Sequence, residues 1–144
     1  MNDQSYHITI ELSATPSAVF NCLIEVPKWW SKDFRGQSTK QNDEFIIQHG
    51  DRHFSKQKLI EVSPDKKLVW WVTESRLSWL EHDKNEWTHT KMIFELTPKG
   101  DKTILDFTHE GLIPEKECYS RCEQGWNMVI KDCLYHLISE GKTI

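Results

Sequence analysis

The sequence predicts an α+β fold, in which one antiparallel sheet of six strands closes on a long C-terminal helix. Two observations carry this prediction. Strand-like segments follow one another between residues 44 and 111 with only short turns between them, and one long helical pattern fills most of the rest of the chain. Strands that run together and helices that stand apart are typical of α+β proteins, so the sheet and the long helix are expected to bury their apolar faces against each other.

The chain is expected to begin with a strand and a short helix. Between Tyr6 and Leu12 apolar and polar residues alternate, which indicates a strand with one buried face. Thr15 can then cap a helix that has Pro16 in its first turn, and the apolar stripe of this helix ends before Pro27. One or two short helices are therefore expected after the first strand, followed by a brief turn at 28–30.

Five further strand patterns come in close succession after a polar surface loop at 36–43. They cover Glu44 to His49, Arg52 to Val62, Lys67 to Ser75, Glu86 to Leu96 and Lys102 to Gly111. Gly, Pro and Asp residues in the turns between them favour tight reversals, so neighbouring strands should pair as antiparallel hairpins. The section 76–85 is assigned no regular structure, because three apolar residues interrupt a polar loop there.

Strand alternation also predicts which side chains face the core. The inward sets are Leu68, Trp70 and Val72 on one strand, Met92, Phe94 and Leu96 on the next, and Leu105, Phe107 and His109 on the last. By the same parity Trp71 points to the outer face, where a loop or a partner subunit could cover it. Parity alone decides between Trp70 and Trp71 here, and the sequence does not settle which of them faces the cavity.

The C-terminal helix is predicted from a 3.6-residue apolar period that runs from Leu112 to Gly141. Pro114 suits the first turn, where its missing N–H is not needed, and Gly141 is typical of a helix end. About 25 residues at 1.5 Å each give a helix of about 38 Å, which is long enough to cross a small domain.

Size and charge narrow the function classes. The 144 residues, 38% of them hydrophobic, fit a single domain over 1–144. The formal charge of −4 and the absence of a large Lys/Arg cluster argue against a nucleic-acid partner. The longest apolar run, Leu68 to Val72, is too short to span a membrane, and the polar start has no signal-peptide core. A cytoplasmic protein is expected.

A set of short motifs occurs along the chain in a fixed order. They are Thr15-Pro16 with Val19-Phe20, Trp29-Trp30, the run Ser63 to Trp70, the run Phe94 to Pro98 followed by Thr103, Thr108 to Leu112, and Gly125-Trp126. In this order they resemble the START-like, or SRPBCC, superfamily with its helix-grip fold, and within it the family named after the activator of heat-shock protein 90 ATPase, of the single-domain bacterial type.

The resemblance covers essentially the whole chain. It implies a curved six-stranded sheet around the C-terminal helix with an apolar cavity between them, but it does not imply one activity. The eukaryotic activators carry a separate N-terminal chaperone-binding domain, which this chain is expected to lack. Contact with a chaperone is therefore possible in principle but has no support in the sequence.

No constellation of residues predicts a catalytic centre. His109 and Glu110 are strand neighbours, which point to opposite faces, so they cannot easily act as one acid–base pair. An inward His109 is instead a buried hydrogen-bonded side chain, a ligand contact or a proton-transfer group. The sequence contains no serine nucleophile elbow, phosphate-binding glycine loop or zinc-protease motif.

The four cysteines are expected to be free thiols. Cys118 and Cys122 are four residues apart on the predicted helix, a spacing that suits neither a structural zinc site nor a disulfide. No metal and no cofactor are therefore predicted.

Seven tryptophans are many for a chain of this length, and most should simply pack in the core; the alternative is that at least two of them line a ligand pocket. The predicted ligand-binding residues are Trp30, Trp70, Met92, Phe94, Phe107, His109, Trp126 and Ile130. A charged stretch around Trp79 either closes one mouth of the cavity or forms a solvated loop.

Three functions remain open. The first is a binding module that takes a small apolar or aromatic molecule. The second is an enzyme of the polyketide cyclase or aromatase kind, and the third is a chaperone regulator or other protein-partner module that uses the outer sheet face around Trp71. The sequence favours binding over catalysis, and it is compatible with a monomer or a weak homodimer.

Overall fold

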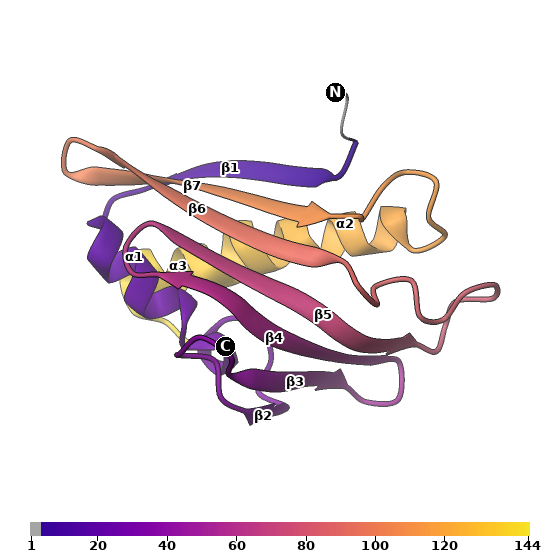
Figure 1. Cartoon of the computed structure of the whole chain (residues 1–144). Helices are drawn as coiled ribbons and strands as arrows, with labels where there is room; N and C mark the ends of the chain where they lie inside the picture. Colours follow the sequence, from indigo (N-terminus) through magenta and orange to yellow (C-terminus); the bar gives the residue numbers. More distant parts are fainter. Residues whose placement is uncertain (1–3) are drawn as a thin grey trace.

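Seven antiparallel strands form one sheet in the computed structural model, which describes residues 4–144 (Figure 1). The strands are β1 (Tyr6–Leu12), β2 (Phe34–Gly36), β3 (Glu44–His49), β4 (His53–Ser63), β5 (Lys67–Leu77), β6 (Lys91–Lys99) and β7 (Lys102–Glu110), in the spatial order β1-β7-β6-β5-β4-β3-β2. All neighbours pair antiparallel, as predicted, but the predicted count of six is one short because β2 adds an edge strand. Register shifts between β4 and β5 at Lys56/Gln57 and Leu59/Glu61 mark bulges, which bend a sheet.

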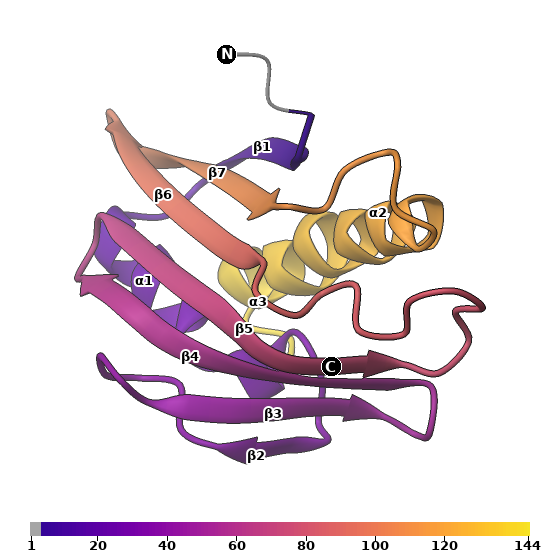
Figure 2. The same ribbon diagram turned by 45° about the vertical axis from the view of Figure 1, so that its right-hand side comes forward.

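The helices are α1 (Pro16–Leu23), a short 3₁₀ turn η1 (Val26–Lys28), and a C-terminal rod made of α2 (Tyr119–Met128), a π-helical segment η2 (Val129–Leu134) and α3 (Tyr135–Glu140). The rod crosses one face of the curved sheet, with α1 beside its C-terminal end (Figures 1 and 2). This is the helix-grip arrangement that the sequence predicts. In the part of the chain that the structure describes, no helix is both long and apolar enough to cross a membrane.

The predicted helix ends are confirmed at α1 and at the C-terminus. The Thr15 hydroxyl accepts a hydrogen bond from the backbone N–H of Ala18 at 3.2 Å, and Pro16 occupies the first turn. Gly141 follows α3 with φ of +70°, the left-handed conformation that ends many helices.

The start of the rod differs from the prediction, because residues 112–118 form turns and regular helix begins only at Tyr119. The carboxylate of Glu86 accepts the backbone N–H groups of Glu117 at 3.0 Å and Cys118 at 2.9 Å. The backbone N–H groups at the start of a helix have no hydrogen-bond acceptor within the helix itself, so Glu86 supplies one for these two. The capping residue lies 31 residues earlier in the chain, so a local pattern could not locate this start.

The start of β6 is also later than predicted, at Lys91 instead of Glu86. Residues 86–90 form a turn in which the Thr90 N–H donates to the carbonyl of Trp87 at 3.0 Å. Trp87 therefore leaves the sheet and packs under the rod, where its side chain is 5% exposed.

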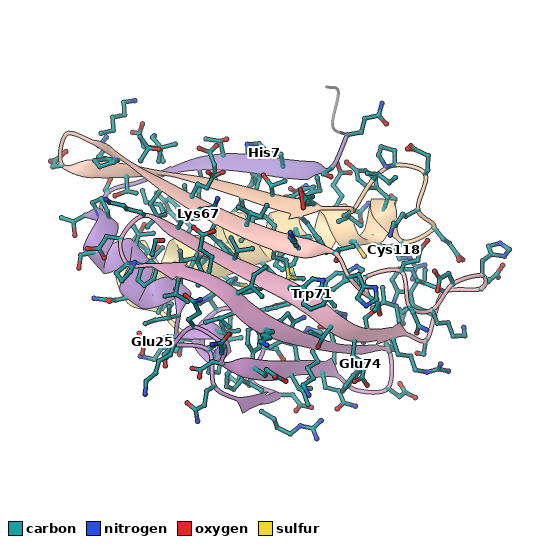
Figure 3. All side chains as sticks on the ribbon, in the orientation of Figure 1. His7, Glu25, Lys67, Trp71, Glu74 and Cys118 are labelled. Carbon is teal, nitrogen blue, oxygen red and sulfur yellow. The ribbon has the colours of Figure 1, made fainter. Side chains whose placement is uncertain are left out.

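The core lies between the sheet and the rod, and the predicted inward sets on β5, β6 and β7 are all buried in it. Trp70 is fully buried, so it is the inward member of the Trp70–Trp71 pair. Trp71 is half-buried on the opposite face of the sheet (Figure 3). Its ring stacks on that of His89, with ring centroids 5.6 Å apart.

Candidate functional site

An open pocket of about 250 Å³ lies at one end of the trough between the sheet and the rod. It is bounded by the ends of β3, β4 and β5, by the β5–β6 connection and by α2, which lie at the same end of the molecule in Figure 2. Its lining residues are mostly aromatic or apolar: Trp30, His49, His53, Leu77, Trp79, Trp87, Arg121, Cys122, Gly125, Trp126, Met128, Val129 and Cys133. A concave apolar site with a few polar groups is typical of small-molecule binding.

Stacked tryptophans form one wall of this pocket. The ring centroid of Trp126 lies 5.0 Å from that of Trp30 and 5.9 Å from that of Trp87, to which it is nearly parallel at 9°. Behind this wall Trp30 stacks on Trp70 at 5.7 Å and 2°. The middle of the trough is therefore filled by rings, and the open space is at its end.

His53, at the start of β4, places an imidazole against this wall. Its ring meets Trp87 edge-on at 4.9 Å, and Nε2 lies 2.8 Å from the hydroxyl oxygen of Ser55. Burial lowers the pKa of His53 to about 3, so the ring is neutral at neutral pH. His49 lies nearer the solvent, and burial lowers its pKa in the same direction. The pocket thus has two neutral imidazoles on its sheet side.

The helical side of the pocket is a stripe on α2 and η2 that contains Arg121, Cys122, Gly125 and Val129. Gly125 follows Arg121 by four residues and Cys122 by three, and Val129 follows Gly125 by four, so they share one helix face. Gly125 has an open space in front of it, because a Cβ added there would meet no atom within 4 Å. The absent side chain keeps this part of the pocket empty.

Two glutamates connect the loop wall to the helix. The Glu86 carboxylate binds the backbone N–H groups at the start of α2, as described above. In return, the Glu117 carboxylate accepts the backbone N–H groups of Glu81 and His82, both at 3.0 Å. These hydrogen bonds lower the pKa of Glu117. The reciprocal contacts position Trp79 and Trp87, the two pocket tryptophans of the β5–β6 connection.

All four cysteines are free thiols, and two of them meet at the base of α2. Cys118, labelled in Figure 3 near the start of this helix, is fully buried, whereas Cys122 lines the pocket. A hydrogen bond from the Cys118 thiol lowers the pKa of Cys122, and the same bond together with burial raises the pKa of Cys118. Residues 4–144 bring together no group of three or more His, Cys, Asp or Glu side chains that could hold a metal.

Of the eight predicted ligand-binding residues, Trp30 and Trp126 line the pocket. The other six are fully buried and do not border it: Trp70, Met92, Phe94, Phe107, His109 and Ile130. His109 uses both ring nitrogens in the core. Nδ1 accepts the indole N–H of Trp126 at 3.0 Å, and Nε2 lies 2.8 Å from the Thr90 hydroxyl oxygen. It matches the buried hydrogen-bonded alternative of the sequence analysis.

Sequence reasoning did not assign His53, Trp87, Arg121, Cys122 or Gly125 to the site. The pocket tryptophan Trp87 was placed in a strand, and nothing near His53 in the sequence marks it. A usable signal existed at Gly125, because a glycine within a helical pattern beside a large aromatic residue indicates a position where space is needed. Trp79, which lies within the charged stretch expected either to close a cavity mouth or to form a solvated loop, lines the pocket.

Comparison with known proteins shows which family this sequence matches. The sequence model of the family described as "Activator of Hsp90 ATPase homolog 1-like protein" matches residues 13–139. No curated protein matches the sequence at a significant level.

Solved structures share the fold over nearly the whole chain. The Aha1 dimer from Colwellia psychrerythraea is 18% identical with a TM-score of 0.77, and the match covers 96% of this chain and 98% of that one. Protein MLL2253 from Mesorhizobium loti is 19% identical with a TM-score of 0.73, covering 92% and 96%. An HSP90 activator from Plasmodium falciparum is 20% identical with a TM-score of 0.62, covering 93% of each chain. These identities support a common fold and no further likeness.

Proposed function

The chain belongs to the activator of Hsp90 ATPase homolog 1-like family, and from this premise we propose that it is a binding protein for a small aromatic or apolar molecule. The proposed site is the pocket at the end of the trough. One observation carries the proposal: an open space of about 250 Å³ whose walls include four tryptophans, Trp30, Trp79, Trp87 and Trp126.

The chemistry of the walls fits such a ligand. Flat rings on the ligand can stack on or meet the tryptophans edge-on, and each such pair adds to the free energy of simple burial. Removing about 200 Å² of apolar ligand surface from water contributes about 5 kcal/mol before the costs of association. The neutral His53 and His49 can supply hydrogen bonds that orient the ligand.

The alternative of a cyclase-like enzyme has one observation in its favour, a histidine in the pocket wall. A general base works best when its pKa is near the working pH. Burial holds the pKa of His53 at about 3, far below neutral pH. Its hydroxyl partner Ser55 is fully buried and does not border the pocket. Binding is therefore better supported than catalysis.

The alternative of a protein-partner module was linked to the outer sheet face around Trp71. His89 stacks on Trp71, and the large exposed hydrophobic residues in 4–144 are Met128 and Tyr135, both on the C-terminal rod. The printed description of the Plasmodium falciparum relative as an HSP90 activator applies to that protein. Chaperone contact, oligomeric state and cytoplasmic location remain predictions for this chain.

A leucine at Gly125 tests the proposed site. Its side chain would enter the open space without a backbone clash, because a Cβ at this position meets nothing within 4 Å. Gln124→Leu is the matched control, since it adds the same side chain at the exposed neighbouring position. With 2-naphthamide as a neutral two-ring probe in isothermal titration calorimetry, the wild type and Gln124→Leu should bind, and Gly125→Leu should lose binding. Equal binding by all three proteins would contradict the proposed site.

A further inference from the structure

Arg121 lies at the border of the proposed ligand pocket and forms no ion pair with an acidic side chain among residues 4–144. Its guanidinium carbon is 5.2 Å from the ring centroid of Trp79, a cation–π distance that fixes the position of the guanidinium group over the ring. A guanidinium held over a ring by a cation–π contact keeps its N–H donors available for a planar anion.

The charge of the pocket comes from this residue alone. Arg121 is the one Lys, Arg, Asp or Glu side chain among the lining residues, and the two lining histidines have pKa values lowered by burial, so they are neutral at neutral pH. The chain as a whole carries a formal charge of −4. A pocket with a positive border on a negatively charged protein selects ligands by charge as well as by shape.

Two carboxylates lie on the other side of Arg121. Glu81 and Glu117 border a second, more open hollow that also includes Arg121. The Glu117 carboxylate already accepts the backbone N–H groups of Glu81 and His82. Arg121 therefore separates an acidic hollow from an apolar pocket. Of these three charged side chains, Arg121 alone also lines the apolar pocket.

We propose that the ligand of this pocket is an aromatic acid whose rings lie among the tryptophans and whose carboxylate pairs with Arg121. This inference rests on the proposed function and adds the ligand's charge to it. The pair would sit at a partly solvated border, where a charge-assisted bidentate hydrogen bond contributes modestly. The expected preference for the acid over a neutral ligand of the same shape is about 5- to 10-fold in Kd.

The test compares 2-naphthoate with 2-naphthamide, which differ in charge but hardly in shape. Isothermal titration calorimetry with the wild type should show about 5- to 10-fold tighter binding of 2-naphthoate at low salt, and the preference should shrink at high salt because the pair is exposed. Arg121→Gln should remove the preference, so that 2-naphthoate and 2-naphthamide bind this variant with similar affinity. Arg121→Lys keeps the charge and should retain part of the preference.

Lys131→Gln provides the control, because it removes one exposed positive charge from the same rod at a position that does not border the pocket. This variant should keep the full preference. Equal binding of both probes by the wild type, or an unchanged preference in Arg121→Gln, would overturn the assignment of Arg121 while the proposed pocket stands. Failure of both probes to bind the wild type would overturn the proposed function together with this inference.

Discussion

The indole N–H of Trp126 donates a hydrogen bond to Nδ1 of His109 at 3.0 Å, which joins the C-terminal rod to β7. Because Nδ1 accepts this bond, the imidazole proton lies on Nε2 and faces the Thr90 hydroxyl oxygen at 2.8 Å. The Thr90 hydroxyl in turn donates to the carbonyl of Trp87 at 2.6 Å. One chain of hydrogen bonds thus connects helix, sheet and pocket wall inside the core.

The Trp126→Ala variant should lose about 3 to 5 kcal/mol of unfolding free energy. The change removes a ring that is 3% exposed and leaves a cavity beside Phe107, whose ring centroid is 4.7 Å away, and it also leaves His109 Nδ1 without its donor. Urea unfolding measures the loss. Trp126→Phe should cost less because most of the packing remains. A near-neutral effect of the alanine variant would contradict the placement of this ring.

Acid should destabilise the protein through His109. Burial lowers its pKa to about 3 in the folded state, compared with 6.5 for an ordinary histidine. Between pH 3 and 6.5 the imidazole binds a proton in the unfolded chain but not in the folded one. The contribution of neutral His109 to the unfolding free energy is therefore complete above about pH 6.5 and is lost as the pH falls toward 3. The expected slope is about 1.4 kcal/mol per pH unit.

His109→Gln isolates this contribution, since it removes the titrating group and leaves His53 and the carboxylates in place. Unfolding free energies measured between pH 4 and 6 should fall less steeply in the variant than in the wild type, by about 1.4 kcal/mol per pH unit. Parallel slopes for the two proteins would show that His109 is not buried in neutral form.

Replacement of Gly36 and of Gly125 by alanine should change the unfolding free energy in opposite directions. Gly36 has φ of +107°, and an added Cβ would lie 2.3 Å from the carbonyl oxygen of Glu44, so Gly36→Ala should destabilise by about 2 kcal/mol or more. Gly125 lies inside α2 with open space in front of it, so Gly125→Ala should stabilise by about 0.5 to 1 kcal/mol. Urea unfolding of both variants compares the signs, and effects of the same sign would contradict the two environments.

Cys122 should react with iodoacetamide faster than the other three cysteines. The hydrogen bond from Cys118 lowers the pKa of Cys122, whereas burial raises the pKa values of Cys22 and Cys133 and also adds to the rise at Cys118. Trypsin places the four cysteines on separate peptides, 1–28, 117–121, 122–131 and 132–142, so mass spectrometry can follow each thiol.

A ligand in the pocket should also slow this alkylation, because Cys122 lines the pocket and Cys22 does not. Saturating 2-naphthamide is expected to protect Cys122 and to leave the rate at Cys22 unchanged. Faster reaction at the fully buried Cys118, or protection of Cys22 alone, would contradict the described placement of the thiols.

The fold was predictable from the sequence where local periodicity decides the structure. Alternation placed Trp70, Phe94 and Phe107 in the core, and they are fully buried. The sequence could not reveal contacts between distant segments. The three-residue strand β2 has no alternation to detect and depends on pairing with β3. The start of α2 depends on a carboxylate from the β5–β6 connection.

The candidate site was predictable only in part, for a related reason. The sequence favoured residues at the centre of the trough, but Trp30 and Trp70 stack there and leave the open space to the end. That end is formed by the β5–β6 connection and by the helix stripe that contains Gly125. No local sequence pattern predicts the path of this connection. Which ring fills a space is set by packing in three dimensions, and this information is not contained in strand parity.

The claim that the end of the trough binds an aromatic molecule has a direct test in the seven tryptophan indole N–H signals of a ¹H–¹⁵N NMR titration with 2-naphthamide. Signals from the pocket residues Trp30, Trp79, Trp87 and Trp126 should shift together and saturate, and that of Trp71, on the opposite sheet face, should stay in place. No saturable shift among the four, or a saturable shift confined to Trp71, would contradict the claim.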